Sequence, residues 1–421
     1  MQAFLPMLSL FGNKKIVAPA LPCYNRKQAV SCVFRRRSAY FLWKEPIAMP
    51  KSARKLHLEA LRILASFLVL FNHTGEQGFF LFAAYPPQHP AYWLYLALSI
   101  ACKAAVPIFF MVSGALLLED SREEPLRVLF RKRILRTALL LVLISLVYYL
   151  WQRVLWDAPA SLPEFLELLY AGRVITPLWY LYAYLGFLLA LPLLRRLARA
   201  LGNREFFYWV ALALLFQGLL PTLSAWLWKE QAPACGLSLG WLLEQAVFYP
   251  CLGYFAEHRL QQTQLTRRRI ALLWLGSLAG IAISALLTAR AAQQSGICTE
   301  AASQGFFSCF TPLLAFTLYL TARKLLGQKQ AQTRGGRLLC ALGGSTLGIY
   351  LLHVLLMNQP PLSTLVATLT ARGCNPMLAI LLFCAIVWLA GCALSLLAKR
   401  LPGLKPGFEK STLYKGAFFH S

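Results

Sequence analysis

Ten apolar stretches of about 20 residues constrain this chain more than any other feature of its sequence. A helix needs about 20 apolar residues to cross the roughly 30 Å hydrocarbon layer of a membrane. The chain is 58% hydrophobic and only 14% charged, a balance that is rare in soluble domains. The stretches cover approximately residues 57–77, 92–118, 134–155, 177–198, 206–228, 238–257, 270–289, 304–326, 338–358 and 377–398. The sequence therefore predicts an all-α integral membrane protein, a bundle of about ten transmembrane helices, with Pro221 and Pro250 interrupting the fifth and sixth.

The distribution of Lys and Arg predicts the orientation of this bundle. Basic residues are concentrated in alternate connections, at 122–133, 195–204, 259–269 and 323–337, and in the tail at 399–415. Because basic loops stay on the cytoplasmic side, both termini are expected in the cytoplasm. The formal charge of +26 then follows from topology and from contact with anionic membrane lipids. The basic residues are dispersed over several loops, so no nucleic-acid partner is expected.

The two ends of the chain are predicted to lie outside the membrane domain at 49–400. Residues 1–48 carry many basic residues and one acid, Glu45. They are either a disordered basic leader, such as a targeting segment, or a mis-assigned start ahead of Met49. Residues 401–421 form a short basic cytoplasmic tail. The eleven cysteines are scattered without a metal-ligand spacing, so no metal site is expected, and a disulfide among Cys235, Cys298 and Cys374 remains an alternative.

The first apolar stretch carries an unusual set of polar side chains. Arg62 and His73 are eleven residues apart, which is three helical turns, so they share one face at a separation of about 16 Å. Glu59 and Ser66 fall on the same face. Ionisable groups inside a membrane are costly, so such a stripe is a candidate functional site. The structural alternative is that Glu59 and Arg62 neutralise each other at i, i+3 and that His73 packs against a neighbouring helix.

Four segments of the chain resemble signatures of one known family. The first runs from Leu58 to His73, in which Arg62 is followed after ten residues by His73. The others are Val-Pro-Ile-Phe-Phe-Met-Val-Ser-Gly at 106–114, Leu-Trp-Tyr-Leu-Tyr at 178–182 and Gly-Ile-Tyr-Leu-Leu-His at 348–353. Their order over residues 56–400 is similar to that of the acyltransferase 3 family of multi-pass membrane O-acyltransferases.

This resemblance implies an enzyme of the bacterial inner membrane. Such an enzyme takes an acyl group, usually acetyl, from acyl-CoA and passes it to a hydroxyl of a cell-envelope carbohydrate or its lipid-linked precursor. Acetyl-CoA is then a substrate, and no bound cofactor is implied. The family's residues carry over to His73, Arg62 and Glu59 as the catalytic group. Glu59 stands where Asp is commoner, and Pro177 stands where many members have a polar residue.

An acyl transfer needs a base for the hydroxyl proton and donors for the oxyanion. Imidazole, with a pKa of about 6.5, suits the first task, so His73 is the expected general base. Fixed donors in a water-poor site suit the second task. The substrate-binding candidates in other stretches are Lys103, Ser113, Trp179, Tyr182 and His353. Trp and Tyr near helix ends are also typical of the membrane interface, and an intramembrane His is also typical of helix packing.

A second class of protein fits part of the same pattern. A proton-coupled multi-pass transporter or flippase of a small or lipid-linked substrate would also bury His and Arg within its spans. Such carriers often contain two similar halves, and no motif repeats between residues 56–230 and 240–400. A third alternative is a regulatory membrane domain that keeps the fold without the chemistry. The sequence does not indicate an oligomeric state.

Overall fold

The computed structural model describes residues 54–119, 125–228, 236–237, 239–295, 306–329 and 331–398. Every regular element in these ranges is helical, which confirms the all-α prediction for this part of the chain. The expected leader at 1–48 and tail at 401–421 lie outside the described residues, as do Cys235 and Cys298. Cys374 is a free thiol.

Seven helices in the described ranges are long and apolar enough to cross a membrane. They are Pro90–Leu117 (α2, Pro90–Cys102, with α3, Ala105–Leu117), Leu126–Leu155 (α4, Leu126–Leu129, with α5, Leu135–Leu155), Thr176–Ala200 (with α7, Trp179–Ala200), Asn203–Trp228 (α8, Asn203–Leu214, with α9, Leu220–Trp228), Arg267–Gln293 (in α12, Arg267–Ser295), Phe306–Leu326 (with α13, Thr311–Leu326) and Pro376–Ala398 (α17). An eighth span is formed if α14 (Arg334–Gly343) and α15 (Thr346–Met357), which meet at 54°, cross together.

The sequence predicts about ten membrane-spanning helices, and two of the expected spans correspond to short helices in the structure. α1, Leu56–Asn72, has 17 residues and is about 25 Å long, and α11, Gln245–Tyr254, has 10 residues. Both are shorter than the roughly 30 Å hydrocarbon layer. All ten predicted stretches contain helix, but the described residues support a multi-span protein with seven or eight clear spans.

The expectation that Pro221 and Pro250 interrupt their helices is wrong. Pro250 lies inside α11, and the helix around Pro221 is also continuous. The helix runs from Asn203 to Trp228, with a wider π-helical turn at Leu215–Leu219 directly before the proline. The Thr222 hydroxyl donates to the Gly218 carbonyl at 2.7 Å. Membrane helices tolerate an internal proline through local π adjustments of this kind, so the span continues.

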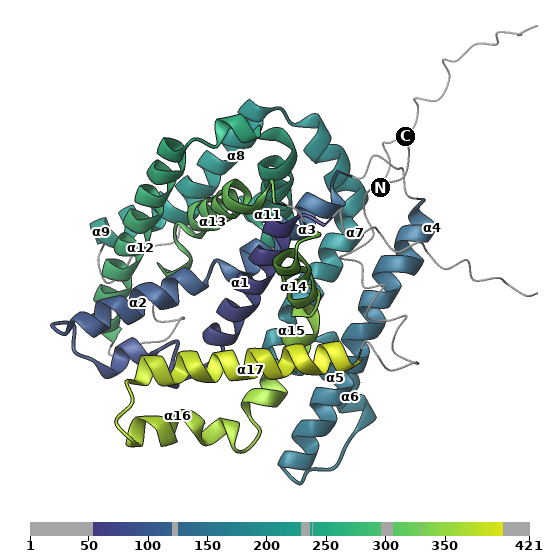
Figure 1. Ribbon diagram of the computed structural model, residues 1–421, viewed down its shortest axis with the longest axis vertical. Helices are drawn as coiled ribbons and strands as arrows, with labels where there is room; N and C mark the ends of the chain where they lie inside the picture. Colours follow the sequence, from purple (N-terminus) through teal and green to yellow (C-terminus); the bar gives the residue numbers. More distant parts are fainter. Residues whose placement is uncertain are drawn as a thin grey trace, which may run out of the picture. The chain divides into compact units, whose positions relative to one another are not determined.

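α1 is an inner helix of the membrane unit. It packs against α3, α13, α14, α15 and α17, which lie around it in Figure 1. Eleven of its 17 residues are buried. A helix that is apolar on most sides is buried on most sides. Its few polar side chains are therefore held in the interior of the bundle.

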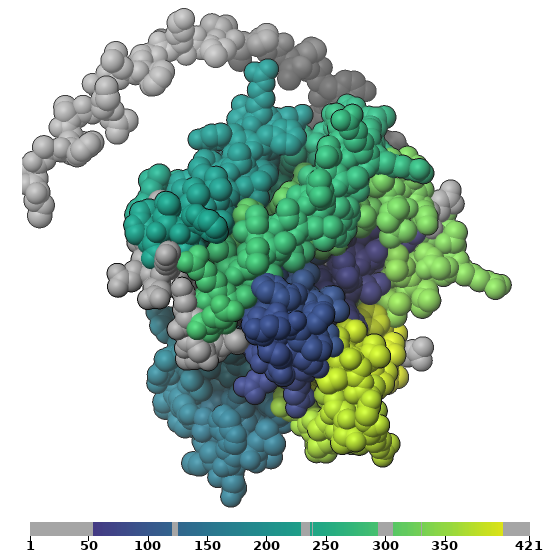
Figure 2. All heavy atoms as spheres, turned by 90° about the vertical axis from the view of Figure 1, so that its left-hand side faces the viewer, coloured from purple at the N-terminus to yellow at the C-terminus, as the bar shows by residue number. Residues whose placement is uncertain are grey.

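α3 and α11 approach each other closely at two glycines. A Cβ atom at Gly114 would overlap the backbone of Pro250, and a Cβ at Gly253 would overlap the backbone of Met111. Small residues allow helix backbones to pack tightly in membrane proteins. On another face of the molecule, α2 lies beside α12, and α16 (Leu362–Ala371) lies beside α17 (Figure 2).

The ends of helices that were predicted to share one side of the membrane do meet one another. Glu257 accepts from Lys55 Nζ at 2.9 Å, His57 Nε2 at 2.9 Å and the Tyr319 hydroxyl at 2.8 Å. This carboxylate joins the start of α1 to the middle of α13. We refer to this part of the bundle as the charged end.

Two further contacts extend the charged end. Arg195 Nε, near the end of α7, donates to the Leu117 carbonyl at 2.8 Å. Beside it, His258 Nδ1 lies 2.9 Å from the Glu119 carboxylate, and its hydrogen bond holds the pKa of that carboxyl below its usual range.

Candidate active site

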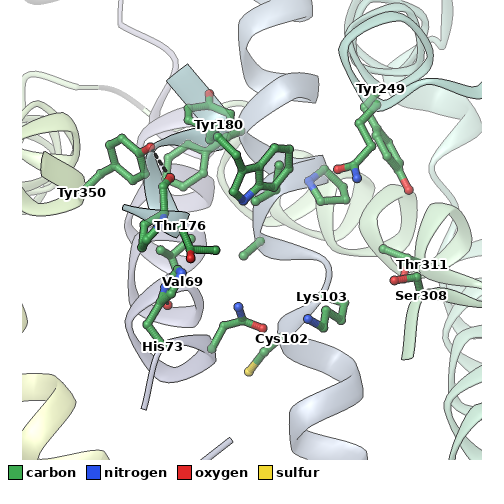
Figure 3. Close-up of a pocket in the computed structure, with 18 of the residues that line it drawn as sticks. Val69, His73, Cys102, Lys103, Thr176, Tyr180, Tyr249, Ser308, Thr311 and Tyr350 are labelled. Atoms are coloured by element: carbon green, nitrogen blue, oxygen red, sulfur yellow. Dashed lines mark hydrogen bonds between the residues drawn. The ribbon is translucent and has the colours of Figure 1, made fainter. Parts of the chain in front are cut away.

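A cavity of 640 Å³ lies between several helices near the C-terminal end of α1. Its described lining comes from the end of α1, the α2–α3 junction, the start of α7 with the turn before it, the middle of the Asn203–Trp228 helix, α11, the start of α13 with the turn before it, and α15. We call it the central cavity. The side chains of His73 and Lys103 enter this space from opposite sides (Figure 3). These two residues are 30 positions apart in the chain and come to line one cavity only in the folded bundle.

His73 is positioned by the way in which α1 ends. It is the C-cap residue, and the chain turns at Gly75, which has a positive φ of 56° that glycine adopts without strain. Thr74 secures the turn, because its hydroxyl donates to Phe71 O at 2.6 Å and accepts from Phe79 N at 2.9 Å. His73 is therefore held at the cavity wall by the helix end itself.

The hydrogen bond of the His73 ring determines which nitrogen is basic. Nδ1 lies 2.8 Å from the Val69 carbonyl oxygen. A carbonyl only accepts hydrogen bonds, so Nδ1 carries the proton in this contact. In the neutral ring the lone pair is then on Nε2. The geometry leaves Nε2 as the nitrogen that can take a proton from a bound hydroxyl.

Lys103 lies at the break between α2 and α3. Pro107 has no N–H, so it cannot donate to the carbonyl four residues earlier, and the helix is interrupted at 103–104. The Lys103 ammonium lies 4.7 Å from the centroid of the Phe79 ring and 6.0 Å from that of Phe307. Both distances are within the range of cation–π attraction. Two aromatic rings therefore support a cation inside the bundle.

Glu59 and Arg62 form a buried ion pair toward the other end of α1. Arg62 Nη1 lies 3.1 Å from Glu59 Oε1, and the two residues are 2% and 3% exposed. This is the i, i+3 pair that the sequence offered as the structural alternative. Neither residue is part of the described lining of the central cavity. The three turns between Arg62 and His73 keep them in separate parts of the bundle.

The other expected substrate-binding residues divide into two groups. Trp179 lines the central cavity together with Lys103. Tyr182 is outside that lining, and its hydroxyl donates to the Leu169 carbonyl of α6 (Leu162–Tyr170) at 2.6 Å. Ser113 is also outside the lining and donates to the Phe109 carbonyl at 2.8 Å. Its side chain also bonds to that of Tyr180, which does line the cavity.

His353 lies beside His73, although 280 residues separate them in the sequence. The ring centroids are 5.0 Å apart, and His353 is fully buried. Its Nδ1 lies 2.6 Å from the Tyr350 carbonyl, so this nitrogen also carries the proton. Its Nε2 has no hydrogen-bond partner among the described residues. The two intramembrane histidines of the sequence thus form a pair.

Several polar residues of the cavity were not among the sequence candidates. They are Asn72, Thr176, Tyr180, Gln217, Gln245, Tyr249, Ser308, Thr311 and Tyr350. The Tyr350 hydroxyl donates to the Pro177 carbonyl at 2.6 Å, which is the dashed line in Figure 3. Gln217 and Gln245 each stand nearly alone in an apolar stretch. Isolated amides of this kind were the signal in the sequence that would have indicated a cavity.

Across the described ranges, no three His, Cys, Asp or Glu side chains gather in a geometry that would hold a metal ion. The polar groups of the described lining are instead hydroxyls, amides, two thiols, one indole N–H, one ammonium and one imidazole. The described residues thus form a multi-span helical bundle with an imidazole and an ammonium at an internal cavity, which is a membrane protein with a buried polar site.

The family follows from a comparison of sequences. A family model described as an acyltransferase domain, Acyl_transf_3, matches residues 56–396. The chain belongs to this family, the acyltransferase 3 family that its four signatures resemble. No curated protein and no solved structure matches the chain. Family membership indicates a multi-span membrane acyltransferase.

Proposed function

We propose that this protein moves an acyl group, acetyl by default, from acyl-CoA to a hydroxyl of a cell-envelope carbohydrate or its lipid-linked precursor. The observation that carries the proposal is His73, a ring at the wall of the central cavity whose Nδ1 is bonded to Val69. Its Nε2 is the base. The proposed setting is the bacterial inner membrane, with both termini and the charged end in the cytoplasm.

The reaction begins with proton transfer from the acceptor hydroxyl to Nε2 of His73, while the hydroxyl oxygen attacks the thioester carbonyl. A C–O bond forms, and the carbonyl oxygen becomes an oxyanion. The intermediate collapses with cleavage of the C–S bond, and the imidazolium returns its proton to the departing thiolate. The products are an O-acyl ester and free CoA.

Two groups of the cavity suit the charges that develop in this reaction. Lys103 brings a cation to the side of the cavity opposite His73, where it stabilises negative charge on the oxyanion or on the donor. Trp179 adds an N–H donor and an apolar ring to the lining.

His353 and Arg62 support His73 and α1 in this proposal. His353 contacts the His73 ring, so it acts as a positioning residue and limits the orientations of the base. Arg62 is buried and paired with Glu59, which favours a role in fixing α1 over direct contact with a CoA phosphate.

The decisive experiment measures thioester turnover by the purified full-length protein. With acetyl-CoA and membrane glycan as substrates, the unaltered protein is expected to release CoA thiol and to acetylate the glycan. Mass spectrometry of the glycan then identifies the added group and its carrier. The alternative is tested with the protein in liposomes. If the protein carries a substrate into the liposomes but does not turn over acetyl-CoA, a proton-coupled transporter or flippase is favoured instead.

A further inference from the structure

His73 also lines a second pocket, with a volume of 390 Å³. We call it the acceptor-side pocket. Its other walls come from the turn after α1, the C-terminal part of α15, α16 and α17. Besides His73, its polar lining residues are Thr74, Glu76, Gln77, Asn358 and Ser363. One imidazole therefore borders two separate spaces, of which the proposed function above uses only the central cavity.

The chemistry of the acceptor-side pocket differs from that of the central cavity. Its described lining contains one carboxylate, Glu76, and no Lys or Arg, whereas the described lining of the central cavity contains Lys103 and no carboxylate. A donor that carries phosphates is repelled by a carboxylate and attracted by a cation. The charges thus favour binding of the acyl donor in the central cavity. They favour binding of an uncharged molecule in the acceptor-side pocket.

The remaining lining residues suit a molecule with many hydroxyls. Gln77 and Asn358 offer amide groups that both donate and accept hydrogen bonds, and Ser363 adds a hydroxyl. Phe383, with Ile380 and Met357, provides an apolar wall on which the C–H face of a sugar ring can pack. Convergent polar groups over an apolar wall are typical of small-molecule sites.

The acceptor-side pocket is open at the end of the bundle opposite to the charged end. α1 begins near Lys55 at the charged end, and the pocket lies just after its C-terminus. Glu76, Gln77 and Asn358 are exposed, so the pocket is accessible from the surface. If the charged end faces the cytoplasm, this opening faces the side on which envelope carbohydrate lies.

We infer that the acceptor-side pocket binds the acceptor as an uncharged sugar or a similar polyol, with its reacting hydroxyl at Nε2 of His73. The acyl donor occupies the central cavity at the same time. This inference rests on the proposed acyl transfer and adds the site and the chemical class of its acceptor. The bonds that form and break are those of the reaction given above.

The test separates use of the donor from transfer to the acceptor. Membranes that contain the full-length protein are incubated with acetyl-CoA labelled in the acetyl group. The label recovered in membrane saccharide measures transfer, and the label recovered as free acetate measures hydrolysis. We expect Ser363→Trp, which fills the pocket, to lower transfer at least tenfold and to leave hydrolysis within twofold of the unaltered protein.

Two further variants keep the test decisive. Thr364→Trp is the matched control, because Thr364 is the next residue of α16, is exposed and is outside the described lining. This variant is expected to change neither the transfer nor the hydrolysis of the acetyl group. Asn358→Leu removes one exposed amide at nearly constant size and is expected to lower the ratio of transfer to hydrolysis severalfold.

Three results would contradict the inference or its basis in different ways. Unchanged transfer in both Ser363→Trp and Asn358→Leu would show that the acceptor binds elsewhere. Equal loss of hydrolysis and transfer in both variants would assign the pocket to the donor. Absence of hydrolysis and of transfer in the unaltered protein would instead contradict the proposed function itself.

Discussion

At the scale of single residues, the chemistry depends on one ring nitrogen. Replacing His73 with Ala removes the base, and general-base catalysis typically contributes about 10²–10⁴-fold to a rate. We expect His73→Ala to lower acyl transfer by at least a hundredfold, with normal insertion into the membrane. The measurement is CoA thiol release per molecule of purified protein, with protein amount checked by immunoblot.

His89→Ala is the control for the His73 variant. His89 is an exposed histidine at the N-cap of α2 and is not part of the described lining of either cavity. It is expected to retain most of the activity. Activity retained by His73→Ala itself would end the assignment of His73 as the base.

Variants of Arg62 test whether its ion pair with Glu59 in α1 only stabilises the fold or also contributes to the reaction. Breaking a buried pair by removing one partner typically costs about 3–5 kcal/mol, because the other charge is left uncompensated. We therefore expect Arg62→Ala to lose activity and to unfold at lower temperature in detergent. Arg62→Lys keeps the charge and is expected to retain part of the activity and part of the thermal stability.

A second variant separates the two roles of Arg62. Glu59→Gln together with Arg62→Gln removes both charges of the pair, so thermal stability is expected to recover relative to Arg62→Ala. If activity recovers as well, Arg62 acts only by fixing α1. Equal turnover in the unaltered protein, Arg62→Ala and Arg62→Lys would show that its charge has no part in the reaction.

At the scale of helices, the packing of α3 against α11 depends on glycine. A Cβ at Gly253 overlaps the Met111 backbone, which cannot move aside as a flexible side chain would. Overpacking of a close contact typically costs about 1–3 kcal/mol. We expect Gly253→Ala to lower the unfolding temperature in detergent and to reduce activity, because α11 carries Gln245 and Tyr249 into the central cavity.

Gly186→Ala is the matched control for the glycine prediction. Gly186 is a helical glycine in α7, and a Cβ placed there meets no atom within 4 Å. Because Ala is the better helix former, this variant is expected to keep or slightly raise the unfolding temperature. An equal loss of stability in both variants would indicate that the helical glycines act through flexibility, not through close packing.

Hydropathy predicted where the helices lie, since backbone groups in a membrane must be satisfied within a segment. It did not predict their breaks. Pro107 interrupts a helix at Lys103, whereas the segment around Pro221 continues through a π turn, and hydropathy does not distinguish the two prolines. The stripe from Glu59 to His73 followed from helical spacing. The contact of His73 with His353 did not, because it depends on the packing of α15 against α1.

At the scale of the whole molecule, orientation decides from which side each reactant arrives. The α13–α14 connection near Lys329 belongs to the basic set that predicts a cytoplasmic position. α15 leads away from that side, α16 has only 10 residues and is too short to cross, and α17 leads back. The turn at Gly373 between α16 and α17 is therefore expected on the opposite side.

A protease-cleavage sequence inserted beside Lys329 or Gly373 tests this topology in the full-length chain. The Gly373 insertion is expected to be cut by protease added outside intact spheroplasts, and the Lys329 insertion only in inside-out vesicles. The acceptor-side pocket lies on the Gly373 side of the bundle, since the end of α15 and the start of α17 both contribute to it. The reverse cleavage pattern would open this pocket to the cytoplasm, and an acceptor from the cell envelope would then have no direct access to His73.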